Sequence, residues 1–367
     1  MAKRLRSGYT TGACAAAAAK GAALGLLTGQ AADQVTIPFP DASRVTFSVC
    51  RWQPEAGGAF LASVVKDAGD DPDVTNGAEI VAVAARLTGN ELPPGCVVPE
   101  AGGRLLLCAG EGVGMVTKPG LPVAVGEPAI NPVPRRMIAA AVGEALAAAG
   151  EQSRVMVIIS VPNGEVLAAR TLNQRLGIVG GLSILGTTGI VRPVSAEAWT
   201  ATISASMDVA RAVGLDEVVL STGRTSERAV QELLGLPEEA LAMMGDYLAF
   251  SLKAAAAHGF RRIHLAAMWA KAVKAAMGIP QTHVRHGALE ADEAVGLLAR
   301  LEVEPALLKE LKGANTAREL YERLMALGRA DVIRLVCSEA KAFAERTAGL
   351  PVDFYLVDSR GKVVERV

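Results

Sequence analysis

Arginines at a helix start are the residues best suited to grip an acidic ligand. Arg135 and Arg136 stand just before the helix-forming run MIAAAVGEALAAAG, in a rigid entry set by Pro132 and Pro134. Cations in a first helical turn oppose the helix dipole, so this pair predicts a bound carboxylate or phosphate, which arginine holds with two hydrogen bonds. The alternative is that the arginines pair with Glu127 or with another carboxylate.

A glycine-rich stretch over 172–195, LNQRLGIVGGLSILGTTGIVRPVS, is the second candidate. Its short apolar runs, bounded by glycines, predict buried strands. The backbone N–H of Gly186 and the hydroxyls of Thr187 and Thr188 suit a polar or anionic ligand, and Arg175 flanks them. The alternative is a glycine-hinged connector. A phosphate-loop pattern inside the stretch has threonine in place of its lysine, so a nucleotide-hydrolysing site is weakly supported.

Hydroxyls and a carboxylate near the N-terminus form a third group. Thr10 and Thr11 precede the run ACAAAAAKGAALGLLTG, and either could cap a helix that reaches about Leu27. The start of that helix could bind an anion or a polar ligand, and tight helix packing is the alternative. Asp70, in the acidic loop over 67–73, is a candidate for proton handling, although a turn before the next element explains the same residues.

The fourth group lies where a strand gives way to a helix. Thr222, Gly223 and Arg224 follow the apolar run EVVLS and open a helical segment. In parallel sheets, ligands bind at the carboxyl ends of strands, often against a helix start. A capping box closed by Glu227 is the alternative interpretation.

The elements that must position these groups fall into two sets. From 34 to 65, alternating short runs predict antiparallel strands, whereas after 195 helices and strands alternate, which predicts a parallel sheet. We therefore predict two domains, α+β and α/β. Residues 1–175 form an α+β domain with a mostly antiparallel sheet and the arginine anion site. Residues 176–367 form a Rossmann-like α/β domain with a mostly parallel sheet, the expected cofactor side.

The composition of the 367 residues excludes several classes of protein. Apolar residues are 51% and aromatic residues 4%, which indicates a sizeable aliphatic core. A net charge of −1 provides no field for nucleic acid or an anionic membrane. No apolar run of about 18 residues lacks a charge, and no apolar signal core follows the basic start MAKRLR, so we expect a cytoplasmic protein without a membrane span.

The five cysteines form no C-x-x-C pair and are odd in number. They predict reduced core residues of a cytosolic protein, and neither a zinc site nor a disulfide framework. These residues are Cys14, Cys50, Cys96, Cys108 and Cys337. His283 and His286, three apart without a carboxylate partner, are weak evidence for a metal ion, and no metal site is predicted.

Four blocks of the sequence together resemble one known family. They are GYTTGACAAAAAKGAA, KDAGDDPDVTNG, EGVGMVTKPGLPVAVGEPAINPVPRRMI and LGIVGGLSILGTTGIVRPVS. The chain resembles the CbiD family, the cobalt-precorrin-5B C1-methyltransferases of anaerobic cobalamin biosynthesis, from residue 8 to about residue 287. The match is looser after residue 195. Members commonly carry Gly-His-x-Gly-Lys where this chain has AMWAK over 267–271, so that only Lys271 persists.

The resemblance implies transfer of a methyl group from S-adenosylmethionine to C1 of cobalt-precorrin-5B, giving cobalt-precorrin-6A. That tetrapyrrole carries acetate and propionate arms and its own cobalt. The residues expected to bind the substrate are Asn131, Arg135, Arg136 and Arg175. Those expected to bind the cofactor are Gly186, Thr187, Thr188, Thr222, Gly223 and Arg224. Those expected to serve catalysis are Thr10, Thr11 and Asp70.

Two other functions stay open from the sequence. One is a small-molecule kinase that holds phosphates with GGLSILGTTG, and the other is a non-catalytic tetrapyrrole carrier. Hand-over of intermediates to other corrinoid-pathway enzymes and assembly into a homo-oligomer are further expectations.

Overall fold

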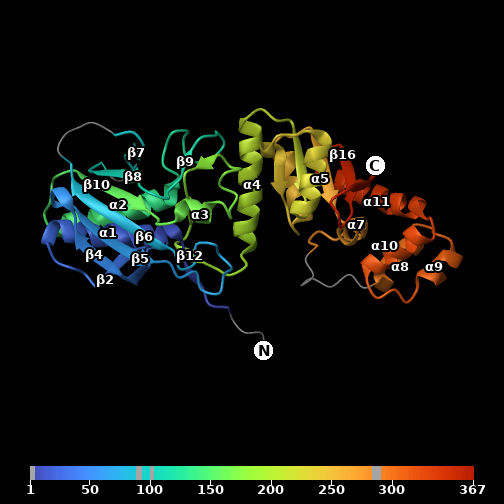
Figure 1. Cartoon of the computed structure of the whole chain (residues 1–367), viewed down its shortest axis with the longest axis horizontal. Coiled ribbons are helices and arrows are strands. Elements are labelled where there is room, and N and C mark those ends of the chain that lie inside the picture. The colour runs from blue at the N-terminus through green and yellow to red at the C-terminus, as the bar shows by residue number, and fades with distance from the viewer. Residues whose placement is uncertain (1–4, 88–92, 100–102, 283–290) are drawn as a thin grey trace. The chain divides into compact units, whose positions relative to one another are not determined.

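Contacts divide the chain into two compact units, Met1–Ser195 (unit 1) and Ala196–Val367 (unit 2), whose elements are labelled in Figure 1. The computed structural model describes residues 5–87, 93–99, 103–282 and 291–367. Both units mix helices with strands, so the protein is a mixed α/β protein. The division falls after Ser195, whereas the sequence placed it after residue 175.

Strand pairing explains why the glycine-rich stretch folds with unit 1. Within that stretch, β11 (Ile178–Val179) pairs with β9 (Met115–Val116). Further along, β12 (Ile190–Val191) pairs with β1 (Gly8–Tyr9) near the start of the chain. Both partners lie far away in sequence, and no local composition marks such a connection.

Unit 1 is built on a six-stranded mixed sheet of order β4-β5-β6-β10-β8-β7. Its strands are β4 (Arg51–Pro54), β5 (Phe60–Val65), β6 (Glu79–Arg86), β10 (Val155–Ser160), β8 (Leu105–Ala109) and β7 (Cys96–Val97). Strands β8 and β10 run parallel, and the other neighbours are antiparallel. A separate hairpin joins β2 (Gln34–Pro38) to β3 (Arg44–Ser48). The short helices of this unit are η1 (Ala56–Gly58) and α3 (Gly164–Ala168).

Helices α1 (Thr11–Thr28) and α2 (Pro132–Ala148) pack against each other, and α1 also packs on β5 and β6. Alanines on every side of α1 are buried, which permits this close approach. Helix α1 is long and apolar enough for a membrane span by length and composition, yet 78% of the tested window is buried, as in the core helix of a folded domain. Lys20 of α1 pairs with Glu144 of α2, and Gly12 approaches Pro134, so the two helices run parallel.

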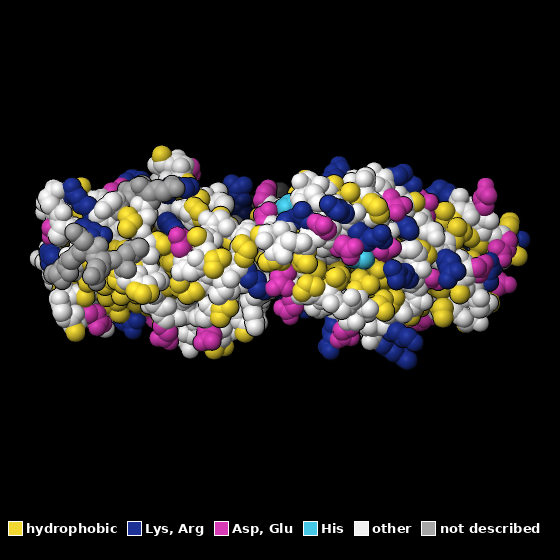
Figure 2. Space-filling view, turned by 90° about the horizontal axis from the view of Figure 1, so that it is seen from above, with side chains coloured by type: hydrophobic (Ala, Val, Ile, Leu, Met, Phe, Trp, Pro, Cys, Tyr) yellow, Lys and Arg dark blue, Asp and Glu magenta, His cyan; other side chains and the backbone are white. Residues whose placement is uncertain are grey.

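Unit 2 is built on a five-stranded sheet of order β14-β13-β15-β16-β17. Its strands are β14 (Leu241–Met243), β13 (Glu217–Ser221), β15 (Arg262–Ala267), β16 (Val352–Val357) and β17 (Val363–Arg366). The first four run parallel, and β17 returns antiparallel beside β16. Over the part of unit 2 shown in Figure 2, acidic and basic side chains are interspersed, in keeping with the small net charge.

Helices cover both faces of this sheet. Helix α5 (Arg224–Leu234) packs on one face, where Val219, Ala266 and Tyr355 are buried. The larger core on the other face includes side chains of α4 (Ala196–Ala212), α6 (Leu248–Ala257), α7 (Trp269–Ala276) and α11 (Ala330–Ala348). The remaining helices are η2 (Glu238–Ala240), α8 (Ala291–Arg300), α9 (Pro305–Leu311) and α10 (Ala317–Ala326).

The cysteines correct the prediction that all are reduced core residues. Cys96 and Cys108 form a disulfide, because the antiparallel register of β7 and β8 places them directly opposite each other. Cys50 is an exposed free thiol, whereas Cys14 and Cys337 are buried as predicted. Burial raises the pKa of both buried thiols to about 12, so they are unreactive at neutral pH.

Candidate functional site

The first turns of α1 and α2 meet beneath the glycine-rich stretch of unit 1. The N–H of Gly12 donates to the carbonyl of Leu185 at 3.0 Å, and the N–H of Asn131 donates to the carbonyl of Ile184 at 2.9 Å. The N–H of Thr10 donates to the carbonyl of Gly189 at 3.0 Å. Residues 184–189 therefore lie across both helix starts and hold them in one place.

The hydroxyls of Thr10 and Thr11 take part in this junction. Thr10 caps α1, since its Oγ1 accepts from the N–H of Ala13 at 3.1 Å. Oγ1 of Thr11 accepts from the N–H of Leu185 at 2.9 Å and donates to its carbonyl at 3.2 Å. Both threonines, which the sequence predicted to serve catalysis, are buried. In the structure they attach the loop over 184–189 to the start of α1.

Gly186 is required by this packing. Its φ is 132°, and a Cβ there would lie 2.5 Å from the side chain of Thr10. Thr187 and Thr188 follow it and are exposed. Oγ1 of Thr188 bonds the backbone of Ile190 at 3.2 Å, whereas Thr187 makes no side-chain hydrogen bond within the described part of the chain. The hydroxyl of Thr187 is thus presented at the surface of the junction.

The two arginines of α2 have different surroundings. Arg135 is half-buried; its Nε donates to the carbonyl of Ile130 at 2.6 Å, and its guanidinium pairs with Glu127 at 2.8 Å. The alternative from the sequence, pairing with Glu127, is the observed one. Arg136 is exposed and makes no ion pair or hydrogen bond among the described residues. Since Pro132 and Pro134 remove two backbone N–H groups from this helix start, an anion here depends on Arg136.

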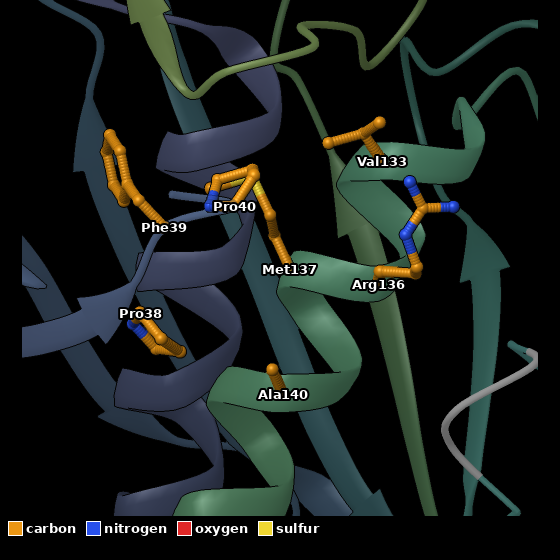
Figure 3. A pocket seen from close by; sticks show the side chains of 7 residues that line it. All are labelled: Pro38, Phe39, Pro40, Val133, Arg136, Met137 and Ala140. Carbon is orange, nitrogen blue, oxygen red and sulfur yellow. The ribbon is translucent and has the colours of Figure 1, made fainter. Parts of the chain in front are cut away.

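An open cavity of about 280 Å³ lies between α2 and the β2–β3 hairpin. Its lining residues are Pro38, Phe39, Pro40, Val133, Arg136, Met137 and Ala140. Figure 3 shows Met137 extending from α2 toward Pro40, while the guanidinium of Arg136 is turned away from Phe39. The cavity therefore combines an apolar floor with one cation at its rim. The sequence pattern singled out Arg136 but none of the floor residues.

Phe39 connects the cavity with the glycine-rich stretch. A Cβ on Gly189 would lie 2.6 Å from the Phe39 ring, so the two are in close contact. The ring also packs edge-on against Tyr9, with centroids 6.2 Å apart. The structure thus brings Asn131, Arg136 and the 186–189 loop into one neighbourhood. Arg175 is half-buried in a turn, where its carbonyl accepts from Lys118 at 3.5 Å, and it does not line the cavity.

Asp70 belongs to an acidic loop that binds the start of the chain. Its carboxylate accepts from the N–H of Arg6 at 2.7 Å, and the Arg6 side chain pairs with Asp67. The hydrogen bond from Arg6, followed by one from the N–H of Gly69, lowers the pKa of Asp67 to about 2. Nearby, Asp73 pairs with the fully buried Lys66 at 2.6 Å. The contacts of Arg6 hold the loop against the N-terminal segment, whereas the pair of Lys66 and Asp73 fixes the loop to the end of β5.

The fourth predicted group, in unit 2, stands at the carboxyl end of β13. The N–H of Thr222 donates to the carbonyl of Ala266 at 3.2 Å, and Gly223 is the N-cap of α5 without a side-chain cap bond. The hydroxyl of Ser221 bonds the buried Glu227 at 3.2 Å. Arg224 is exposed. The predicted cofactor residues are therefore divided, with the 186–188 group in unit 1 and the 222–224 group in unit 2.

A cluster that the sequence pattern missed lies after β14 and in α7. Nζ of Lys271 donates to Asp246 and, at 2.9 Å, to the carbonyl of Thr282. Nζ of the buried Lys274 donates to the same carbonyl at 3.0 Å. Burial, together with the neighbouring Lys271 charge, lowers the pKa of Lys274. Only the isolated Lys271 of the AMWAK run gave a signal for this cluster.

Two family models match the sequence of the chain. The one described as CbiD matches residues 1–193, and the one described as "CbiD, C-terminal domain" matches residues 281–367. The chain belongs to the CbiD family. Three of the sequence blocks that resemble this family lie close together in the structure. GYTTG opens α1, NPVPRR opens α2, and SILGTTG crosses both helix starts.

Relatives match over almost the whole chain. A protein of Desulfotalea psychrophila named cobalt-precorrin-5B C(1)-methyltransferase is 57% identical over 360 residues, which are 98% of this chain and 97% of the relative. One of Geotalea daltonii with the same name is 49% identical, covering 93% of this chain and 92% of that protein. A crystal structure titled cobalamin biosynthesis protein (cbiD) from Archaeoglobus fulgidus is 25% identical, with a TM-score of 0.40, and covers 88% of this chain and 85% of that one.

The described residues contain no group of three or more His, Cys, Asp or Glu side chains that could hold a metal ion. The pair His283 and His286 lies outside the described residues.

Proposed function

We propose that the chain transfers a methyl group from S-adenosylmethionine to C1 of cobalt-precorrin-5B, giving cobalt-precorrin-6A in anaerobic cobalamin biosynthesis. The observation that carries this proposal is the 57% identity, over 98% of the chain, to a relative named for that reaction. Unit 1 holds the tetrapyrrole, and unit 2 is the cofactor side.

The cavity beside α2 suits the edge of a tetrapyrrole. Phe39, Pro40 and Met137 provide an apolar floor for the ring, and Arg136 at the rim can grip an acetate or propionate arm. Desolvation of the flat ring contributes binding energy, while the guanidinium selects for an acid. Asn131 at the start of α2 is a second polar contact in this assignment. Arg135 serves the site indirectly, by fixing the loop that leads into the helix.

The methyl donor supplies an electrophilic carbon on a positively charged sulfur. The chain's own contribution is to orient the reactants and to exclude water, and such positioning alone can accelerate a reaction by several powers of ten. In unit 2, the start of α5 leaves room for the methyl donor. A side chain at Gly223, the N-cap of α5, would enter open space, and the start of a helix can bind an anion or a polar ligand. Gly186, Thr187 and Thr188 offer further polar contacts in unit 1.

The mainly parallel sheet of unit 2 is assigned as Rossmann-like. The enzyme is proposed to act in the cytoplasm, to form a homo-oligomer, and to hand its product to the next enzyme of the corrinoid pathway.

An anaerobic assay tests the reaction directly. The purified chain is incubated with cobalt-precorrin-5B and S-adenosylmethionine, and the corrinoid mass and S-adenosylhomocysteine are measured. We expect one added methyl group per corrinoid, and roughly tenfold weaker corrinoid binding or more for Arg136→Ala, since a charge-assisted bond is lost. Arg228→Ala, an exposed arginine on α5, is the matched control. Corrinoid binding without methylation would favour a carrier, and ATP binding without donor binding would favour a kinase.

A further inference from the structure

An exposed tryptophan in unit 2 is held rigidly at the carboxyl edge of the parallel sheet. Trp199 lies in the first turns of α4, and 46% of its surface is exposed. Its Nε1–H donates to the carbonyl of Met244 at 3.3 Å. The indole stacks on the Tyr247 ring, with centroids 6.4 Å apart and planes 27° from parallel. A large aromatic surface is therefore both accessible and fixed.

The backbone beneath the indole is shaped to receive it. Gly245 has a φ of 56°, and a Cβ there would lie 3.0 Å from the Trp199 ring. A side chain at this position would push the indole away from the turn. The other tryptophans differ: Trp269 is buried, and Trp52 packs on Phe60 in the core of unit 1.

The turn that carries this arrangement is anchored on several sides. The N–H groups of Met244 and Gly245 both donate to the carbonyl of Ser221, at the end of β13. Asp246 accepts hydrogen bonds from Lys271 and, at 2.9 Å, from the hydroxyl of Thr282. The rings thus stand at the end of the parallel strands, where ligands of such sheets bind.

We propose that Trp199 and Tyr247 form a stacking platform for the purine ring of a nucleoside. The inference rests on the proposed function and identifies the ligand as the adenosyl part of the methyl donor. An indole matches a purine in size and stacks well on it.

Calorimetry and tryptophan fluorescence with S-adenosylhomocysteine test the platform. We expect Trp199→Ala to weaken binding roughly tenfold or more and Gly245→Ala to weaken it by displacing the indole. Binding should quench fluorescence in the wild type and in the matched control Trp52→Phe, but not in Trp199→Phe. Corrinoid affinity should be unchanged in Trp199→Ala. The conservative Trp199→Phe, which keeps a stacking ring, should bind with intermediate affinity.

The outcomes separate this proposal from the function on which it rests. If the wild type methylates the corrinoid while Trp199→Ala and Trp199→Phe bind S-adenosylhomocysteine as tightly as the wild type, the platform is wrong and the reaction stands. If Trp199→Ala loses corrinoid affinity instead, the platform holds the macrocycle and the assignment to a purine is wrong. If the wild type does not use S-adenosylmethionine at all, the proposed function is wrong.

Discussion

Gly12 and Pro134 hold the first turns of α1 and α2 in direct contact, since a Cβ on Gly12 would lie 2.6 Å from Cγ of Pro134. The same Cβ would lie 3.2 Å from the carbonyl oxygen of Leu185. The absence of a side chain at one position therefore lets two helix starts and the loop above them share one site.

Gly12→Ala is expected to destabilise unit 1 by about 1–3 kcal/mol, the usual range for overpacking. Thermal unfolding followed by circular dichroism would show a midpoint several degrees lower. Gly143→Ala, in α2 but with no atom within 4 Å of the added Cβ, is the matched control. That change should be neutral or stabilising by up to about 1 kcal/mol, because alanine favours helix. Equal midpoints for both variants would show that the contact at Gly12 tolerates a methyl group.

Substitution of Arg135 should lower the stability of unit 1 much more than substitution of Arg136. Arg135→Ala removes the bonds to Ile130 and Glu127, so we expect a loss of about 2 kcal/mol in the free energy of unfolding. Arg136→Ala should change stability by less than about 0.5 kcal/mol, because the exposed side chain has no partner among the described residues. Urea unfolding measures both variants. Arg136→Ala as the less stable variant would contradict these assignments.

Features that depend only on neighbouring residues, such as helix caps and helix starts, could be predicted from the sequence. Of the two threonines predicted as caps, Thr10 caps α1, and a cap of this kind depends only on the residues of its own helix start. The helix predicted to open at Arg224 is α5. The alternation of helices and strands after residue 195 predicted a parallel sheet, and four strands of the sheet in unit 2 are parallel.

The features that could not be predicted from the sequence depend on contacts between segments that lie far apart in the chain. The pairing of Arg135 depends on the path of residues 127–131, which no periodicity describes. Phe39 reaches the cavity only because the β2–β3 hairpin lies beside α2, about a hundred residues later in the chain. Cys96 and Cys108 are 12 residues apart, and only the register of β7 and β8 makes them partners.

Thiol titration should distinguish the cysteines in three steps. The native protein should react quickly at Cys50 alone, because Cys14 and Cys337 are buried and their pKa is raised to about 12. In denaturant without reductant, three thiols should react, and after reduction all five. Five thiols in denaturant without reductant would show that the Cys96–Cys108 bond does not form. Cys50→Ser is the matched control, since it should abolish only the fast reaction.

Because of Glu144, the free energy of unfolding of unit 1 should depend on pH in the acidic range. Bonds from Arg44 at 2.8 and 2.9 Å, and then from Lys20 at 2.5 Å, lower the pKa of Glu144 from 4.5 to about 2. A carboxyl group with a depressed folded-state pKa contributes stability that is fully present above its unfolded pKa. That contribution is lost as the pH falls through the folded value, here between about 4.5 and about 2.

Glu144→Gln should therefore cost about 1 kcal/mol near neutral pH, a value reduced by the partial exposure of the cluster. The difference from the wild type should shrink as the pH falls from about 4.5 and vanish near pH 2. Urea unfolding at a series of pH values measures it. Glu165→Gln on α3, where the glutamate is exposed and forms no ion pair within the described residues, should show no such trend. A constant difference for Glu144→Gln across the whole range would mean that the charge of Glu144 does not stabilise the fold.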